Sequence, residues 1–345
     1  MMLWFLLSFL VFFIIAVFKY MQANIFFPKS SLAIIDEVIK NPNPNIIFGK
    51  MRYIELEDTK ICYENINSKN PEAEVVVLLH GLGQTMLNFP PYFCQSLLAA
   101  GFHIVRIDFQ GGGGSDWVEN WGKPHKYNLE DMARNSLLVM KRLNINKFHV
   151  LGVSMGGMIA QYMAINYPNS ISSLTSIMST AYFFDPEFKG VPKKFILNYL
   201  MSQLVYGKKS KTLSNKIKAR LAIGRLLQGD TTYTFDDRVS IEAAHYEITN
   251  KKGYHPMAAK QHSYAIKKSG SRLAALQKLS VPSLVIHGMA DPLVQLAQGK
   301  KCAAAIPNCK TLFIKGMGHH LPEAFNNEIT SAIQDHINAN WVYKK

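Results

Sequence analysis

Short apolar runs and amphipathic segments alternate along most of this chain, and this alternation constrains the fold more than any other feature. Six short runs rich in apolar and β-branched residues indicate strands buried on both faces; they are Val75–Leu79, His103–Ile107, Phe148–Gly152, Ile171–Met178, Ser283–His287 and Lys310–Lys315. Five segments with apolar residues at helical spacing lie among them: Pro91–Ala100, Leu129–Leu143, Gly156–Tyr167, Leu296–Ala305 and Glu323–Trp341. Strands joined through helices pair in parallel with right-handed crossovers. The pattern therefore predicts an α/β fold, a mostly parallel sheet flanked by helices.

The alternation stops between residues 183 and 271, in a helix-like stretch rich in Lys, Tyr and Met. We predict that this stretch is a helical cap inserted at the carboxyl edge of the sheet. Ahead of the first buried strand, Met51–Leu56 and Lys60–Tyr63 predict a hairpin. The predicted division of the chain is 1–20, a transmembrane anchor or signal segment; 21–50, a spacer; 51–182, the first part of the core; 183–271, the basic helical cap; and 272–345, the second part of the core.

The amino terminus is strongly apolar: residues Met1–Phe18 contain a single polar side chain, Ser8. Because a helix needs about 17–25 residues to cross a bilayer, this run favours an uncleaved, single-pass membrane anchor. A cleaved signal peptide is an alternative, but no basic residue precedes the run and no good cleavage site follows it. A buried core helix is the third interpretation. Lys19 and Lys29 follow the run and favour a cytoplasmic body, with a secreted or periplasmic body as the alternative.

The chain is basic, with 38 Lys and Arg against 24 Asp and Glu and a net charge of +14. Residues 183–271 hold 16 of the basic and 7 of the acidic residues, which places +9 of the net charge in the predicted cap. Ten basic residues and no acidic one lie between Phe188 and Gly229, interleaved with apolar residues such as Phe195, Tyr199, Leu200 and Val205. A solvated cap, a membrane-facing lid and a site for an anionic substrate or partner all fit this pattern. Nucleic acid is not an expected partner, because no recognised nucleic-acid-binding fold accompanies the charge.

Composition and spacing exclude several classes of protein. With 48% hydrophobic residues the chain can bury a sizeable core, which excludes a largely disordered protein. The four cysteines show no C-x-x-C spacing, and neither an H-E-x-x-H pattern nor a phosphate-binding loop occurs, so we predict no metal and no other cofactor. Cys302 and Cys309 are predicted to be buried free thiols.

A candidate nucleophile lies in the motif Gly152-Val153-Ser154-Met155-Gly156, at the turn between a predicted strand and a predicted helix. This is the G-x-S-x-G pattern in the strand-to-helix context that it requires. The turn is so tight that only small residues fit two positions before and two positions after the serine. It leaves the hydroxyl of Ser154 exposed at the positive end of the following helix.

A second loop, His80-Gly81-Leu82-Gly83, follows the strand Val75–Leu79. A tetrahedral intermediate at a serine needs preorganised N–H donors. The backbone amides of Leu82 and Met155, one from each of two strand ends, are the candidate donors of an oxyanion hole. We expect His80 to brace this loop and to take no part in the chemistry.

Two further chemical side chains follow the last two predicted strands: Asp291 and then His319. The order Ser154, Asp291, His319 is that of nucleophile, acid and base in one large class of serine hydrolases. His319 would accept the serine proton, and Asp291 would orient the imidazole and stabilise its cation. The glycine before His319 would let the chain approach the serine. Two alternatives stay open, His320 as the base and Asp185 as the acid.

Together these motifs resemble those of the α/β-hydrolase-fold serine hydrolases, over roughly residues 51–341. The Gly-Met-Gly-His-x-Leu-Pro ending at 316–322 and the polar helix Met257–Ser269 are similar to those of aclacinomycin-methylesterase-like and monoglyceride-lipase-like carboxylesterases. Gln110 stands where such proteins usually carry Arg, and four glycines follow it, so we expect a loose loop there. Asp108, just ahead of this loop, is expected to brace the sheet edge.

The resemblance implies an α/β-hydrolase fold with an inserted cap, and an enzyme that cleaves carboxylic esters through a Ser-His-Asp triad and an acyl-enzyme. Its expected partners are a small-molecule or lipid ester and a membrane. Thioesterase, amidase or aminopeptidase, and C–C hydrolase activities stay open, because the same triad serves all of them. A hydrolase-fold binding protein without catalysis is the alternative of a different class, and the complete set of nucleophile, base and acid argues against it.

Overall fold

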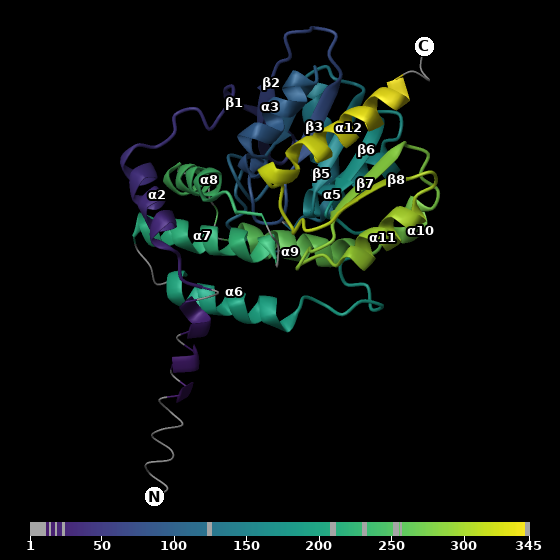
Figure 1. Ribbon diagram of the computed structural model, residues 1–345. Helices are drawn as coiled ribbons and strands as arrows, with labels where there is room; N and C mark the ends of the chain where they lie inside the picture. Colours follow the sequence, from purple (N-terminus) through teal and green to yellow (C-terminus); the bar gives the residue numbers. More distant parts are fainter. Residues whose placement is uncertain are drawn as a thin grey trace, which may run out of the picture.

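The centre of the molecule is a sheet of eight strands in the order β1-β2-β4-β3-β5-β6-β7-β8 (Figure 1). This computed structural model describes residues 12–13, 15–17, 19–22, 25–122, 126–207, 212–229, 233–250, 255 and 257–341. The strands are β1 (Met51–Glu55), β2 (Lys60–Ile66), β3 (Val75–Leu79), β4 (His103–Ile107), β5 (Phe148–Val153), β6 (Ile171–Ile177), β7 (Ser283–Gly288) and β8 (Lys310–Ile314). The pairs β1/β2 and β2/β4 are antiparallel, and all pairs from β4 to β8 are parallel. The predicted mostly parallel sheet is confirmed.

Helices cover both faces of this sheet. On one face, α4, α5 and α11 bury residues such as Leu137, Ile159 and Cys302; on the other, α3 and α12 bury Leu97 and Ile333. Each fully buried aliphatic side chain contributes roughly 1.5–3 kcal/mol to folding.

The helices are α2 (Lys29–Lys40), α3 (Pro91–Ala99), α4 (Leu129–Arg142), α5 (Met155–Asn166), α6 (Lys193–Tyr206), α7 (Leu213–Gln228), α8 (Asp237–Thr249), α9 (Ala258–Ser269), α10 (Leu273–Leu276), α11 (Leu296–Ala305) and α12 (Asn326–Trp341), with short 3-10 helices at Met86–Asn88 and Glu323–Phe325.

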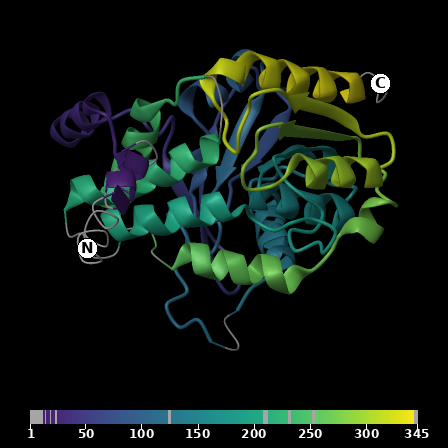
Figure 2. The same ribbon diagram turned by 60° about the horizontal axis from the view of Figure 1, so that its bottom comes forward.

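Helices α6 to α9 lie between β6 and β7 in the chain, in the stretch predicted to be a cap. In Figure 1, α6, α7 and α9 lie below the sheet and α8 lies at its side next to α2, and Figure 2 shows the cap helices in front of the strands. The helix α6 lies outermost, beneath α7. The basic residues Lys208, Lys209 and Lys211 of this stretch lie outside the described residues.

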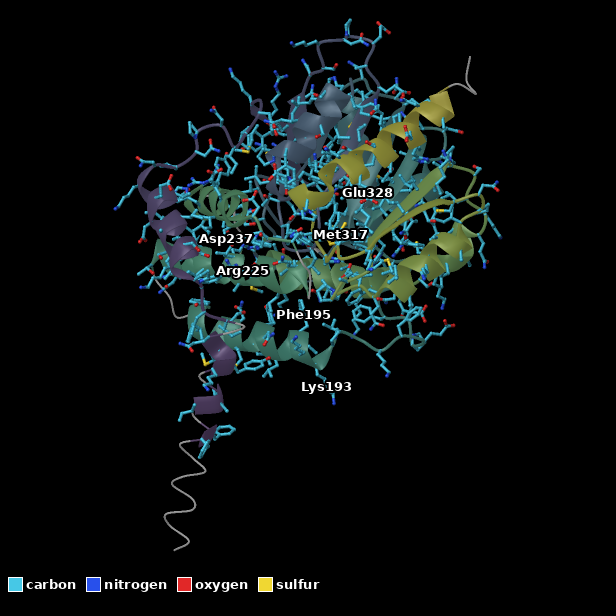
Figure 3. The ribbon with its side chains drawn as sticks, viewed as in Figure 1. Lys193, Phe195, Arg225, Asp237, Met317 and Glu328 are labelled. Carbon is cyan, nitrogen blue, oxygen red and sulfur yellow. The ribbon has the colours of Figure 1, made fainter. Side chains whose placement is uncertain are left out.

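The predicted spacer, residues 21–50, contains the helix α2, which packs on the cap. Its buried residues Ile35 and Val38 share an apolar cluster with residues of α7 and α8, among them Leu221. The guanidinium of Arg225 on α7 donates to the carboxylate of Asp237 on α8 at 2.6 Å and to the hydroxyl of Ser31 on α2 at 2.8 Å (Figure 3). The cap layer is therefore built from two stretches of the chain that are far apart in sequence.

Among the residues that the structure describes, no helix combines the length and the apolar character needed to cross a membrane. The predicted anchor at residues 1–20 falls largely outside them, because residues 1–11, 14 and 18 are not described. The described residues Phe12, Phe13 and Ile15 are helical and expose their side chains.

Candidate active site

The turn between β5 and α5 holds Ser154 in a strained backbone conformation, with φ of 57°. Positive φ is uncommon for residues other than glycine, and such strain persists only where the surroundings enforce it. Here the Ser154 N–H donates to the Ile177 carbonyl at 2.9 Å, and the Ser179 hydroxyl donates to the Ser154 carbonyl at 2.7 Å. A Cβ on Gly156 would collide with the carbonyl of Leu79. The tight turn therefore requires small residues at positions 152 and 156, as predicted.

The structure brings Ser154, His319 and Asp291 into one hydrogen-bonded series. The distance between Ser154 Oγ and His319 Nε2 is 3.0 Å, and that between His319 Nδ1 and Asp291 Oδ2 is 2.6 Å. With Nδ1–H donating to the carboxylate, Nε2 is the atom free to accept from the serine hydroxyl. His319 and Asp291 are buried, and Ser154 is partly exposed. This is the geometry of a nucleophile activated by a general base that a carboxylate orients.

The carboxylate of Asp291 is held ionised by its surroundings. Its burial favours the neutral acid, but His319 and His287 outweigh that cost and hold the pKa of Asp291 well below its usual range. Its Oδ1 also accepts the backbone N–H groups of Leu293 and Val294, both at 2.8 Å. An ionised, hydrogen-bonded carboxylate is what stabilises an imidazolium next to it.

The histidine His287, at the end of β7, was not among the residues singled out from the sequence. Its Nε2 lies 2.8 Å from the carbonyl oxygen of Val294 and 3.4 Å from Asp291 Oδ2. Gly299 makes room for this ring, because a Cβ there would collide with it. A histidine inside an otherwise apolar strand, four residues before Asp291, is the signal that could have drawn attention to it.

The two alternatives for base and acid lie elsewhere. The ring of His320 packs between those of Tyr233 and Phe235, and its burial lowers its pKa to about 4. Asp185 accepts a hydrogen bond from Lys301 Nζ at 2.7 Å. The structure therefore brings neither residue to Ser154 in place of His319 and Asp291.

The loop predicted to supply oxyanion donors lies next to the nucleophile. A Cβ added to Gly81 would lie 3.5 Å from Ser154 Cβ, and Leu82 is the next residue along the chain. Met155 is the first residue of α5, where backbone N–H groups lack an acceptor within the helix. The assignment of the Leu82 and Met155 amides to an oxyanion hole stays a prediction.

Two buried side chains stabilise this region: His80, expected to brace the loop 80–83, and Asp108, expected to brace the sheet edge. His80 Nδ1 lies 2.9 Å from the Gly81 carbonyl oxygen, and burial lowers the pKa of His80 to about 3. The carboxylate of Asp108 accepts N–H groups of Met86 at 2.6 Å and Gly114 at 2.8 Å. The glycines after Gln110 are therefore not loose, because they fold tightly around this carboxylate, and a Cβ on Gly113 would collide with it. The expectation of a loose loop is wrong.

The cap reaches the site at two backbone positions. The carbonyl of Leu227 on α7 accepts the N–H of His319 at 2.7 Å, and a Cβ on Gly318 would collide with the next carbonyl, that of Gln228. Gly318 therefore allows the backbone at His319 to approach the cap, which differs from the expected approach to the serine. On the other side, His262 Nδ1 on α9 accepts the N–H of Gly83 at 3.0 Å.

A cavity of about 840 Å³ lies between the cap and the core, next to this series of residues. It adjoins the site through Leu227 and His320 rather than through Ser154 itself. Its walls combine apolar and polar side chains, the latter including the ion pair between Arg220 and Glu247 at 2.6 Å. Its other lining residues come from α2, α7, α8 and the loops after β3 and β8, among them Ser30, Ile34, Leu87, Ile223 and Leu321.

The profile of the alpha/beta hydrolase fold matches residues 74–323, well over half of the chain. The chain belongs to the α/β-hydrolase family. Rhodomycin D methylesterase DauP of Streptomyces sp. (strain C5) is 25% identical over 304 residues, which cover 84% of this chain and 98% of that protein. A 2-hydroxy-6-oxononadienedioate/2-hydroxy-6-oxononatrienedioate hydrolase of Cupriavidus pinatubonensis is 26% identical over 274 residues, 79% of this chain and 89% of that one.

Among solved structures, the esterase RhEst1 from Rhodococcus sp. ECU1013 has a TM-score of 0.64 and 18% identity, over 84% of this α/β hydrolase and 98% of that chain. Such a likeness shows the shared fold. The predicted resemblance to methylesterase-like hydrolases is confirmed, as is the prediction of an enzyme, a hydrolase acting on ester bonds.

The four cysteines are free thiols, of which Cys309 is only half-buried.

Proposed function

We propose that this α/β hydrolase cleaves carboxylic esters by forming an acyl-enzyme on Ser154. The observation that carries the proposal is the hydrogen-bonded series in which Ser154 Oγ lies 3.0 Å from His319 and His319 lies 2.6 Å from Asp291. The similarity to rhodomycin D methylesterases supports an ester as the substrate. A pure binding protein has no need of a nucleophile, a base and an acid in this order.

In the first half of the reaction, His319 Nε2 takes the proton of Ser154 as Oγ bonds to the ester carbonyl carbon. The amides of Leu82 and Met155 hold the oxyanion of the tetrahedral intermediate, and each such donor lowers the barrier by about 3 kcal/mol. The Asp291 carboxylate stabilises the imidazolium. His319 then gives its proton to the leaving alcohol oxygen as the C–O bond breaks.

In the second half, a water molecule gives a proton to His319 and attacks the acyl carbon. The bond between Ser154 Oγ and the acyl group breaks, the carboxylic acid leaves and Ser154 recovers its proton from His319. No redox step and no group transfer to a cofactor is needed. Every proton moves through the single imidazole that the Asp291 carboxylate orients.

The adjoining cavity supports substrates larger than a small ester. At about 840 Å³ it lies within the usual range of ligand sites, about 300–1,000 Å³. Apolar residues such as Leu87 and Ile223 line it together with the ion-paired Arg220. The proposal therefore includes lipid esters, whose chains would occupy the apolar part of this cavity.

The test is turnover of the full-length protein on p-nitrophenyl esters of increasing acyl length, with a thioester and an anilide of matched acyl group. We expect the esters to be cleaved fastest, and Ser154→Ala to abolish turnover while leaving the melting temperature unchanged. A fluorophosphonate probe should label Ser154. Labelling of another serine, or faster cleavage of the anilide or the thioester, would overturn the ester assignment.

The proposal also includes an uncleaved single-pass anchor at Met1–Phe18 with the body on the cytoplasmic side. Its support is the single polar side chain in that run, and the two lysines, Lys19 and Lys29, that follow it. Membranes washed with alkaline carbonate should retain the protein with its amino terminus intact by mass spectrometry. Protection of the body from protease in right-side-out vesicles should follow, and recovery of a shortened, unattached chain would contradict the anchor.

A further inference from the structure

The helix α6 has its polar and apolar residues on the opposite sides from those expected of a surface helix. Its fully buried residues are Asn198 and Ser202, both polar. Its exposed residues are mostly aliphatic, with Leu200 exposed by 53% and Leu204 by 81%. A helix on the surface of a water-soluble domain normally buries its apolar stripe and exposes its polar one.

The exposed aliphatic residues form one continuous stripe. Positions separated by three, four, seven or eight residues lie on the same side of a helix. We call this side the outward face of α6; it consists of the aliphatic residues Ile196, Leu197, Leu200 and Leu204, with the exposed Lys193 at its start. Figure 3 shows Lys193 on the side of α6 away from the body, and Phe195 on the side towards α7. The aromatic ring of Phe195 thus belongs to the inner side, and the stripe is aliphatic.

The polar side of α6 is used to hold the amino-terminal segment. The hydroxyl of Tyr20 donates to Asn198 Oδ1 at 2.6 Å, and the rings of Phe27 and Tyr206 pack at 5.2 Å between centroids. The described residues before Tyr20 include the exposed side chains of Phe12 and Phe13. This contact therefore holds the amino-terminal segment on the buried side of α6, opposite the outward face.

The direction of the amino-terminal segment relative to α6 is given by its described residues. In Figure 1 the described parts of residues 12–22 leave the body on the side where α6 is the outermost layer, and they run across the direction of α6. A segment that enters a bilayer in that direction places α6 parallel to the membrane surface. Amphipathic helices lie in this orientation, with the apolar face buried among headgroups and acyl chains.

The charge around α6 favours an anionic lipid surface over a protein partner. Lys193 begins the outward face and Lys189 precedes it, both exposed. The sequence between Phe188 and Gly229 contains ten basic residues and no acidic one. Two of the ten, Arg220 and Arg225 on α7, are paired with Glu247 and Asp237 on α8. Basic residues beside an apolar stripe gain free energy at membranes that contain anionic lipids.

We propose that the outward face of α6 docks on a lipid bilayer, embedded at the level of the headgroups and parallel to the membrane plane. This contact adds to the proposed anchor and does not depend on the ester-hydrolase proposal. Lipid, and no protein partner, covers the outward face of α6 in this proposal. The amino-terminal segment and α6 would then hold the cap at a fixed distance and orientation above the membrane.

The test uses the full-length protein, one copy per lipid nanodisc, with an environment-sensitive fluorophore attached through Leu204→Cys. The background is Cys309→Ser, because the other three cysteines are buried. The matched control carries the label through Glu72→Cys, an exposed site in the loop between β2 and β3, at the opposite end of the molecule from α6 (Figure 1). We expect a blue-shifted emission at position 204, quenched several-fold more strongly by nitroxide-labelled lipids than the emission at position 72.

Two results would overturn the proposal. Equal and weak quenching at both positions would show that the outward face of α6 stays in water. A blue shift at position 204 without lipid quenching would show that protein covers this face, and an increase of that shift with two copies per disc would identify the cover as a second copy.

A second pair of variants tests the chemistry of the contact. Ile196→Glu with Leu200→Glu should reduce lipid quenching of the label at position 204 several-fold, most strongly in discs rich in anionic lipid. The control pair Gln95→Glu with Asn327→Glu adds the same charge at exposed sites on α3 and α12 and should leave the quenching unchanged. A matching melting temperature for both pairs establishes that the fold is intact, and equal quenching in both pairs would contradict the proposal.

Discussion

At the carboxyl edge of the sheet polar side chains are buried and paired, whereas on α6 polar side chains are buried and apolar ones are exposed. Asp291 shows the first pattern: its buried carboxylate lies against two backbone N–H groups and two histidines. Leu204 shows the second, since most of its surface faces outward. Buried polar atoms need partners inside the protein, and exposed aliphatic surface gains from partners outside it.

The two regions therefore suit different surroundings. The carboxyl edge of the sheet buries His319 and Asp291 and fixes the distances among Ser154, His319 and Asp291. The outward face of α6 has no such internal network. Changes at the edge should therefore affect turnover strongly, and changes on α6 should affect neither turnover nor folding of the isolated protein.

The largest effect is expected from Asp291→Asn, which removes the negative charge beside His319 and favours the wrong tautomer. A triad of this kind loses about 10⁴-fold in kcat when its acid becomes an amide. The matched control is Asp185→Asn, which removes a carboxylate that pairs with Lys301 and should change kcat little. Steady-state kinetics on one ester measure both, and a reversed order would place the acid after β6.

A smaller effect is expected from Gly318→Ala, because the added Cβ collides with the Gln228 carbonyl at the end of α7. The loop that carries His319 must shift, and a displacement of about 1 Å can cost about 10²-fold in rate. Gly190→Ala is the control, since a Cβ there meets no atom within 4 Å. The ratio of kcat/KM between the two variants measures how strongly the cap positions the base, and equal values would show that it does not.

A still smaller effect concerns acid stability and His262. Burial lowers the pKa of His262 to about 4 from an ordinary value of 6.5, so the unfolded chain binds a proton there that the folded protein does not. The stability it contributes is present above pH 6.5 and is lost as the pH falls towards 4, at no more than about 1.4 kcal/mol per pH unit.

His262→Gln keeps an acceptor for the Gly83 N–H but cannot titrate. Denaturant unfolding at pH 7 and pH 5 should therefore show a smaller loss of stability in this variant than in the parent. His80, His320 and His336 are shifted in the same direction and will maintain part of the acid dependence. An unchanged difference between the two pH values would show that His262 stays neutral in the unfolded chain or charged in the folded one.

The smallest effect is expected on α6. Leu204→Gln should change the free energy of unfolding by no more than about 0.5 kcal/mol, as is usual for exposed positions. Leu221→Ala in the neighbouring α7 should cost about 2–5 kcal/mol, because that side chain is fully buried. Thermal or denaturant unfolding of the two variants in one buffer compares them, and a large loss for Leu204→Gln would mean that the outward face of α6 packs against protein.

Much of the core was predictable because its signals are local. β3, β4 and α11 have the predicted bounds, and the ends of the other core strands differ by only a few residues. Ser154, Asp291 and His319 each follow a strand, and parallel strand ends meet at one edge of the sheet, so their proximity was predictable as well. Their roles as nucleophile, acid and base are predictions, which the kinetic experiments on the Ser154 and Asp291 variants test.

The missed features depend on contacts between distant segments. The spacing of Ile35 and Val38 is helical, but only the apolar surfaces of α7 and α8 explain why α2 folds against the cap. The contact of His262 with Gly83 joins residues 179 positions apart. The orientation of α6 could not be read from its own residues, because apolar residues occur on most of its sides.

The succession of strands and helices along the chain, the tight turn at Ser154 and the positions of Asp291 and His319 after their strands could therefore be predicted from the amino-acid sequence, because burial on two faces, tight turns and parallel connections produce local sequence patterns. Only the tertiary structure decided three other features. These are the hydrogen bond from His319 to Leu227 of the cap, the contribution of α2 to the cavity wall, and the side of α6 that is exposed. Each of these depends on which surfaces remain to be covered once the sheet has formed, and that is a property of the assembled molecule.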